Sequence, residues 1–459
     1  MFLPVLRKEI LSHILSLRFG VTFILFILLV FASIYVTTHE YQRDMAQAAA
    51  RERAAAAQLS EVLKEKALDD RVYRLIEWEG RMDAVPVQPL SAIAQGLRPS
   101  TPVAMRTTAR EFKNVGHGAE RNPLAGLLRA PDLVYVVSVI LSLLAVLFAF
   151  DSICGEKESG TLRLVLSNAV PRDSILLAKW VGGYLVLIIP FLIAALGGLG
   201  YAWWQGSLEL TGDNVKRLAA LLCIACLYIS VFFTLSLFIS TVTHRAVTAL
   251  FVCLLVWVLW ILAVPNLAPV VAKIIAPTPS LEKINAEKRA VDQEIRLRIN
   301  RLTITSGELS YGAKVREEQQ RLFEEGDRQK QQWDRFLERT SKRQTALAET
   351  FGRLSPSVSW TYSAVALANT GPDAYRQFEF SQRKLAKDME NLASRLRQQR
   401  RKAGAFPAVE AGDVPHLQVA WPPFAAAARY ALNDVLILVI LNVIFFLAAF
   451  VSFLRYDVR

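Results

Sequence analysis

The sequence predicts an all-α polytopic membrane protein with six transmembrane helices, an N-terminal interfacial helix and two large external insertions, the second largely helical. Three observations predict this fold class. The chain is 53% hydrophobic with a mean hydropathy of +0.30, six apolar segments are long enough to cross a bilayer, and 20% of the residues are still charged. A spanning helix needs about 20 apolar residues, and the remaining charge indicates substantial parts in water.

The six predicted spans are joined by links of very unequal length.

The first span could be read as a secretion signal, but a charged amphipathic stretch precedes it and its apolar core exceeds the roughly 7–15 residues of a signal's centre. We therefore expect a retained span. The predicted spans are residues 20–38, 132–154, 174–204, 219–242, 243–265 and 430–459, the last range including the end of the chain.

Basic residues near the span ends predict which links face the cytoplasm. If the spans alternate, most of these residues fall on one side, while Lys216 and Arg217 fall on the other. We therefore expect both chain ends in the cytoplasm. The residues that support this orientation are Arg7, Lys8, Arg18, Lys157, Arg163, Arg172, Lys179, Arg245, Arg455 and Arg459.

Two insertions, residues 39–131 and 266–429, then lie outside, with a short external loop at 205–218. The first begins as a helical continuation of span 1 and becomes strand and loop around its Pro-broken stretch at residues 84–87. In the second, residues 281–304 and 313–351 are densely charged, with apolar residues at three- and four-residue steps. We expect a helical hairpin or short coiled coil there, and the sharper alternative is a partner-binding arm.

The first residues, 1–19, have the pattern of an amphipathic helix. Apolar residues recur at helical spacing, and Arg7, Lys8, Glu9 and His13 interrupt them. Such a helix lies in the membrane interface with its apolar side in lipid and its charged side in water. The alternative is a simple anchor ahead of the first span.

Residues 155–173 form a compact, charged link between spans 2 and 3. Glu156, Lys157 and Glu158 open the link, and Gly160–Thr161 and an apolar stretch follow before Pro171 ends it. Such a link can fold as a short helix at the membrane surface, exposed to a soluble partner.

This link resembles the cytoplasmic coupling segment of type-2 permeases of bacterial ATP-binding-cassette (ABC) exporters. There a Glu-x-Glu-x-Gly-Thr-Leu run, here residues 156–162, precedes a Pro-Arg turn and a lysine that opens the next span, here Lys179. The resemblance implies a bacterial cytoplasmic (inner) membrane protein that works with separate cytoplasmic ABC ATPase subunits and a second permease copy or similar permease. It implies ATPase-coupling roles for Lys8, Glu9, Glu156, Glu158, Gly160, Thr161, Leu162, Leu166 and Arg172.

Two external stretches are similar to motifs of a large-loop subgroup of that family. Residues 89–97 match its Pro-Leu-Ser…Gly-Leu motif, and residues 354–371 resemble its Ser-Pro…Gly-Thr segment ahead of the last span. The order here is Asn369-Thr370-Gly371, a mild departure from that segment. The subgroup includes permeases linked to copper-enzyme maturation and to gliding motility.

Several function classes lack their expected residues. No Gly-x-x-x-x-Gly-Lys-Ser/Thr phosphate loop occurs, so we expect no cofactor in this chain, with ATP and Mg in the partner ATPase. No catalytic triad or histidine cluster stands out among 5 histidines, so we expect no enzyme. The net charge of +12 comes without a recognisable nucleic-acid module, so we expect contact with membrane lipid and no nucleic acid. Cys223 and Cys226 are interpreted as small packing residues of one helix face.

Polar residues inside the spans can pack between helices or contact a substrate. Asn442 is deepest and is predicted to pair between helices, with substrate contact as the alternative. Asp151 and Asp434 are explained by exposure near span ends. Since no charge falls convincingly within a span, a proton- or sodium-driven carrier is disfavoured.

The sequence thus favours a permease subunit of an ABC exporter, or of a mechanotransmission complex that moves an outer arm without passing cargo. The main alternative is a non-transporting envelope scaffold whose external helical arm binds a periplasmic partner. Nothing in the spans names a substrate.

Overall fold

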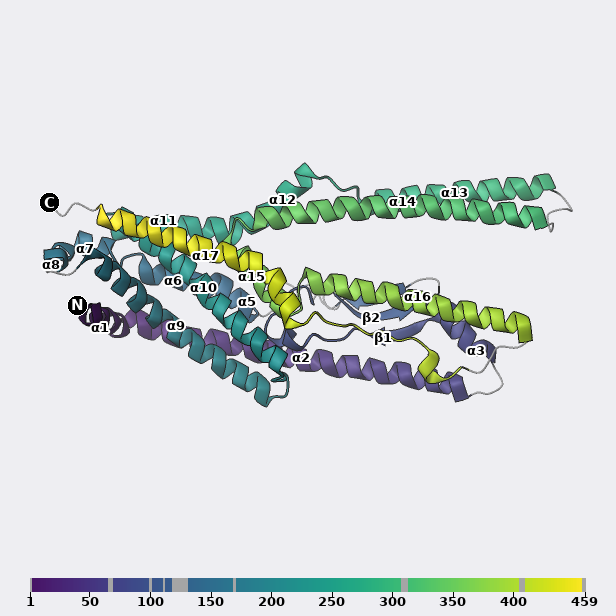
Figure 1. Ribbon diagram of the computed structural model, residues 1–459, viewed down its shortest axis with the longest axis horizontal. Coiled ribbons are helices and arrows are strands. Elements are labelled where there is room, and N and C mark those ends of the chain that lie inside the picture. The colour runs from purple at the N-terminus through teal and green to yellow at the C-terminus, as the bar shows by residue number, and fades with distance from the viewer. Residues whose placement is uncertain are drawn as a thin grey trace. The chain divides into compact units, whose positions relative to one another are not determined.

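The computed structural model describes residues 2–64, 69–98, 101–109, 112–117, 131–167, 171–306, 313–403 and 409–455 (Figure 1). The chain divides into two compact units. The first comprises Met1–Trp257 together with Ser359–Arg459, and the second comprises Val258–Val358.

Six long apolar helical stretches confirm the six predicted spans. Apart from the first, which continues far beyond its apolar part, each is 26–33 residues long, enough for a bilayer of about 30 Å at 1.5 Å per residue. They are Phe19–Val62, Leu133–Glu158, Arg172–Trp204, Gly212–Val242, Ala246–Ile275 and Phe424–Leu454.

The helices of the first unit form two groups along its length. At one end lie α1 (Phe2–Ile14), α7 (Cys154–Glu158) and α8 (Thr161–Ser167), with the last turn of α17 (Phe424–Leu454) (Figure 1). The bundle between the two ends contains α5 (Leu133–Tyr135), a π-helical turn at Val136–Leu141, α6 (Ser142–Ala149), α9 (Arg172–Trp204), α10 (Gly212–Val242), α11 (Ala246–Val258) and most of α15 (Pro356–Leu367).

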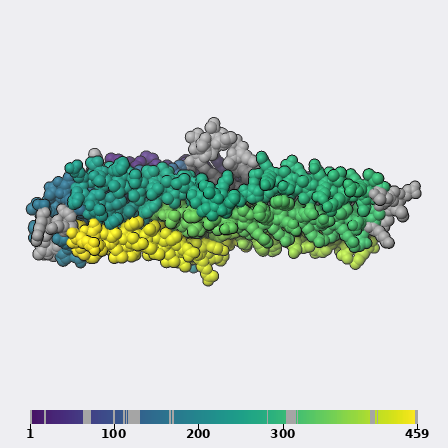
Figure 2. Space-filling view, turned by 90° about the horizontal axis from the view of Figure 1, so that it is seen from above, coloured from purple at the N-terminus to yellow at the C-terminus, as the bar shows by residue number. Residues whose placement is uncertain are grey.

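The bundle packs through small residues and through polar pairs. A Cβ on Gly198 of α9 would collide with the end of the Ile34 side chain, which would have to move, so glycine favours the close approach of α9 to α2 (Leu17–Lys64). Asn442 of α17 accepts hydrogen bonds from Ser230 and Thr234 of α10, at 3.1 and 2.9 Å. The predicted pairing of Asn442 between helices is therefore confirmed. The outer surface of α17 is apolar, and it lies open along the molecule (yellow in Figure 2).

A small domain, here called the distal domain, continues from the bundle at the end opposite α7 and α8 (Figure 1). It is built on α2, whose 48 residues extend about 72 Å. Its antiparallel sheet has the order β1-β2-β3, with Arg81 opposite Thr107 and Ala104 opposite Val115. Its elements are the second half of α2, α3 (Asp69–Arg74), a π turn (Leu75–Glu79), β1 (Arg81–Ala84), a 3-10 turn (Pro89–Ala92), β2 (Pro102–Thr107), β3 (Phe112–His117), α16 (Pro372–Ala403) and a 3-10 turn (Ala411–Asp413).

The distal domain has its own apolar core. Side chains from α2, the sheet and α16 meet in it, and the chain beyond α16 adds Val414 and Leu417. The sequence foresaw the strand-and-loop character near residues 84–87, but it did not foresee α16. The α16 residues in this core are Phe378, Leu385, Met389, Leu392, Ala393 and Leu396.

The second unit is a helical hairpin with a short helix at its base. After a π turn (Leu259–Ala263) and α12 (Val264–Ile275), α13 (Leu281–Ser306) and α14 (Ala313–Gly352) run side by side, which matches the two predicted helices (Figure 1). Ile295 of α13 packs over Gly326 of α14, where a Cβ would lie 2.9 Å from it. Cross-helix ion pairs such as Lys330–Asp292 at 3.0 Å flank this contact.

Three charged residues differ from their predicted settings. Glu9 was expected on the water-facing side of the first helix, but it is 7% exposed because α1 packs its Glu9 face on α9. Asp434 was explained by exposure, but it is 1% exposed within α17. Arg217 lies on the predicted outer side, where the rule for basic residues near span ends does not expect it. Its side chain is 2% exposed and donates hydrogen bonds to two backbone carbonyls.

Candidate functional site

The link that the sequence singled out forms two short helices, α7 and α8, which we call the coupling segment. Gly160 turns the chain between them with φ +73°, a left-handed conformation that favours glycine. The start of α7 is fixed to α10, because the Ser240 hydroxyl accepts hydrogen bonds from the backbone N–H groups of Ile153 and Cys154, both at 3.0 Å. The segment is therefore held to the bundle at its first turn.

The underside of the coupling segment rests on an apolar core. Leu162 is 1% exposed and packs with residues of α9, α10 and α17, which are Ile175, Leu176, Leu237 and Phe453. Thr161, Arg163 and Leu164 are exposed on the other side of α8. The side chain of Leu166, another predicted coupling residue, lies outside the described residues. The segment thus presents one face to solvent and fixes the other.

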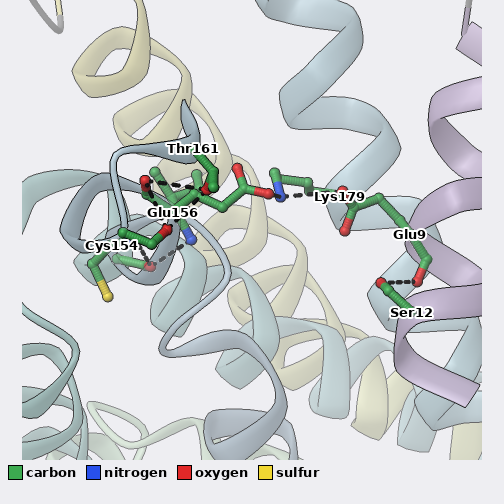
Figure 3. Close-up of polar contacts among 9 residues, drawn as sticks. Glu9, Ser12, Cys154, Glu156, Thr161 and Lys179 are labelled. Atoms are coloured by element: carbon green, nitrogen blue, oxygen red, sulfur yellow. Dashed lines mark hydrogen bonds and ion pairs between the residues drawn. The ribbon is translucent and has the colours of Figure 1, made fainter. Parts of the chain in front are cut away.

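A buried lysine joins the coupling segment to the N-terminal helix. The Lys179 ammonium group on α9 contacts Glu156 Oε1 of α7 at 2.8 Å and Glu9 Oε1 of α1 at 3.2 Å (Figure 3). The side chain of Lys179 is 4% exposed, that of Glu9 9% and that of Glu156 21%. One lysine side chain therefore lies between two carboxyl side chains in a mostly buried site. The Glu156 Oε2 atom is buried without a hydrogen-bond partner among the described residues.

The close approach of α1 to α9 depends on a glycine at the same level. A Cβ on Gly182 would lie 3.1 Å from Glu9 Cβ, tighter than ordinary contact. A larger residue at position 182 would push α1 away and lengthen the Lys179–Glu9 contact.

Neighbouring charges tie the coupling segment to the ends of α10 and α11, and they tie the start of α9 to the end of α17. Lys157 donates hydrogen bonds to the carbonyls of Thr241 and Thr243 at the end of α10. Glu158 accepts from the Ala246 N–H at 2.9 Å, so it caps the start of α11. The Arg172 guanidinium donates to the Leu454 carbonyl at 2.9 Å, at the end of α17.

A groove opens beside these contacts. It has a volume of about 400 Å³ and is lined by residues of α7, α10 and α17 and of the α10–α11 turn. Lys157, His244 and Arg455 are its ionisable residues.

The predicted site residues divide into two groups. Lys8, Glu158, Gly160 and Thr161 are exposed and available to a partner, and Arg172 is half-buried. Glu9, Glu156 and Leu162 face the protein and position the segment. The sequence did not single out Lys179 as a site residue. The available signal was a lysine within an apolar run, which needs a carboxylate partner when buried.

A second polar cluster lies at the opposite end of the bundle. The two external motifs meet there, because the Leu97 N–H donates to the Thr370 carbonyl at 2.8 Å. Arg217 of α10 donates to the carbonyls of Leu367 and Pro422, at 2.7 and 2.6 Å, and pairs with Asp213 at 2.7 Å. The cluster links spans α10 and α17 to the base of the distal domain.

Within the described ranges, no group of three or more His, Cys, Asp or Glu side chains is placed to hold a metal ion. The four cysteines carry no disulfide.

Comparison with known proteins identifies similar sequences. The family described as ABC-2 family transporter protein matches residues 3–458. A probable ABC transporter permease protein NosY of Pseudomonas aeruginosa is 31% identical over 109 residues, which are 23% of this chain and 40% of that protein. A probable NosY permease of Stutzerimonas stutzeri is 42% identical over 62 residues, 14% of this chain and 22% of that protein. The aligned regions therefore span less than half of either relative.

Proposed function

Because the chain belongs to the ABC-2 family of transporter proteins, we propose that it is the membrane permease subunit of an ATP-driven exporter or mechanotransmission complex. It lies in a bacterial inner membrane with the coupling segment in the cytoplasm. Separate ABC ATPase subunits bind ATP and Mg there, and this chain binds neither.

The observation that carries the proposal is the construction of the coupling segment. Its outer face is exposed at Glu158 and Thr161, while its inner face is fixed by Leu162 and by the Glu156–Lys179–Glu9 contacts. A push on the outer face therefore reaches α9 and α1 together. A nucleotide biases the complex only if the ATPase binds this segment differently in its open and closed states.

The long α2 helix supports the mechanical form of the proposal. It runs without interruption from the bundle into the core of the distal domain, where Leu59 is 6% exposed. A stiff helix transmits a tilt over its whole length, so movement at the cytoplasmic end would move the distal domain.

We propose that two such chains, or one with a similar permease, form the membrane unit. An open groove of about 630 Å³ on α2, lined by Ile24, Ile27, Leu28, Phe31, Ala32 and Tyr35, is almost wholly apolar. Lipid covers such a surface on a single chain, and a second copy would cover it in a dimer. Disulfide cross-linking in membranes distinguishes lipid from a second copy. One variant carries Leu28→Cys in the α2 groove, and another carries Val247→Cys at a second exposed apolar position, on α11.

The decisive experiment is ATPase binding by surface variants. Thr161→Arg adds a bulky cation to the exposed face of the coupling segment and should abolish co-purification with the ATPase. Gln331→Arg makes the same kind of change on the exposed face of α14 and should leave it intact. If no ATPase accompanies the unaltered chain at comparable abundance, the non-transporting scaffold is the better reading. If Thr161→Arg binds the ATPase normally, the coupling segment is wrongly assigned.

A further inference from the structure

The far part of α16 carries a strong charge that the proposed function does not use. Residues 381–402 contain eight basic and two acidic side chains, a difference of +6 against +12 for the whole chain. All eight basic side chains are exposed. They are Arg383, Lys384, Lys387, Arg395, Arg397, Arg400, Arg401 and Lys402, and we call them the α16 basic surface.

The basic surface differs from the other charged helices of the chain. On α13 and α14, several basic residues pair with acidic ones, as in Lys330–Asp292, Lys288–Asp334 and Arg321–Glu317, whereas Arg335, Arg339 and Arg343 form no ion pair with the described acidic residues. On α16, no ion pair joins an acidic residue of the described chain to Arg383, Lys384, Lys387, Arg395, Arg397, Arg401 or Lys402. The basic charge of this helix is therefore not balanced by described acidic neighbours.

The basic surface cannot turn inward, because the opposite side of α16 is fixed. Leu385, Met389, Leu392 and Leu396 are all under 7% exposed in the core of the distal domain. Rotating the helix would expose this apolar row, at about 25 cal/mol for each Å² of apolar surface. The charges therefore stay on the surface.

Two simpler explanations do not account for the charge. A helix dipole favours cations only in the last turn, so it explains Arg400, Arg401 and Lys402 but not Arg383 or Lys387. Lipid headgroups at the Pro372 end of α16 would leave its far cations unexplained. Arg395 and Lys402 lie 23 and 30 residues beyond Pro372, or about 35 and 45 Å along the helix, against a screening length of about 8 Å.

We propose that the α16 basic surface binds an acidic segment of a partner protein on the outer side of the membrane. Five of its eight cations are arginines, whose guanidinium groups pair with carboxylates through two parallel hydrogen bonds. The proposal rests on the proposed function only in placing α16 outside the cytoplasm. Binding itself needs neither the ATPase nor transport, so the two can fail separately.

The test uses the full chain in nanodiscs of neutral lipid at physiological salt. The probe is a labelled 16-residue Glu-rich peptide, and the same peptide with Gln for Glu is its blank. Arg397→Gln/Arg401→Gln/Lys402→Gln should weaken Glu-peptide binding at least tenfold. The matched control Arg335→Gln/Arg339→Gln/Arg343→Gln removes the same charge from exposed positions of α14 and should bind as the unaltered chain does.

Further arms separate a protein partner from other anions. Arg395→Lys/Arg397→Lys/Arg401→Lys keeps the charge but not the paired geometry, and it should weaken peptide binding several-fold. Polyphosphate and phosphatidylglycerol vesicles should compete less well than the peptide. Equal effects of the α16 and α14 triple variants, no loss in the lysine variant, or stronger binding to polyphosphate or vesicles would each overturn the proposal. Melting curves of every variant show whether α16 stays folded.

Discussion

Replacing Lys179 with methionine should destabilise the cytoplasmic end of the bundle by several kcal/mol. Without the ammonium group, Glu9 and Glu156 face each other in a mostly buried site. Their Oε1 atoms lie 3.2 and 2.8 Å from Lys179, so the sum, 6.0 Å, is the greatest distance between them. Two carboxylates at that distance repel by about 3 kcal/mol at an effective dielectric constant of about 20. This agrees with the roughly 3–5 kcal/mol measured when one partner of a buried pair is removed.

The assay is equilibrium unfolding in mixed micelles of Lys179→Met beside a triple variant that also carries Glu9→Gln and Glu156→Gln. The triple variant has no unpaired charge, so it should recover most of the lost stability. Lys384→Met, at an exposed position of α16, controls for the loss of a lysine and should change stability little. The reasoning fails if Lys179→Met is as stable as the unaltered chain, or if the triple variant is no more stable than the single one.

Three further predictions concern the other end of the molecule. Gly96→Ala should lower stability by at least about 1–3 kcal/mol, because Gly96 has φ +50° and a Cβ there would lie 2.5 Å from the Thr370 carbonyl oxygen. Thermal melting measures this loss of stability, and an unchanged melting midpoint would contradict the prediction. Arg217→Met should remove the donor to the Leu367 carbonyl and leave the Pro422 carbonyl only its bond from Asn369, so proteolysis between α16 and α17 should speed up; an unchanged digestion rate would count against this. Burial raises the pKa of Asp83 despite the ion pair of Asp83 with Arg81. The Asp83 carboxyl group therefore contributes most to stability below about pH 3.9, and this contribution falls as pH rises through the raised pKa. Asp83→Asn should remove this part of the pH dependence, measured as the difference between the two unfolding profiles, and parallel profiles would contradict it.

Hydropathy and helical spacing were sufficient to predict the elements whose pattern lies within one segment of the chain. The six spans and the α13–α14 hairpin follow from repeats within single segments, so the sequence showed them directly. The coupling segment could also be placed, since its charges, Gly160 and Pro171 are neighbours in the chain.

The features that the sequence did not predict all depend on contacts between residues far apart in the chain. Lys179 and Glu9 are 170 positions apart, and Arg217 and Pro422 are 205 apart, so no local pattern indicates that they meet. Asp434 lies near the end of an apolar stretch, which is typical of exposure, but packing within the bundle buries it. The sheet required β1 to pair with β2 about twenty residues later, and the sequence indicated only strand character near β1.

The central claim is that an ATPase acts on this chain through the coupling segment. Hydrogen–deuterium exchange of residues 154–167, measured in nanodiscs with and without the ATPase and a non-hydrolysable ATP analogue, tests this claim most directly. We predict slower exchange in α7 and α8, and in α1 through Glu9 and Lys179, once the ATPase is bound. If the ATPase binds while exchange in these three helices stays unchanged, force enters the protein elsewhere and the account is wrong.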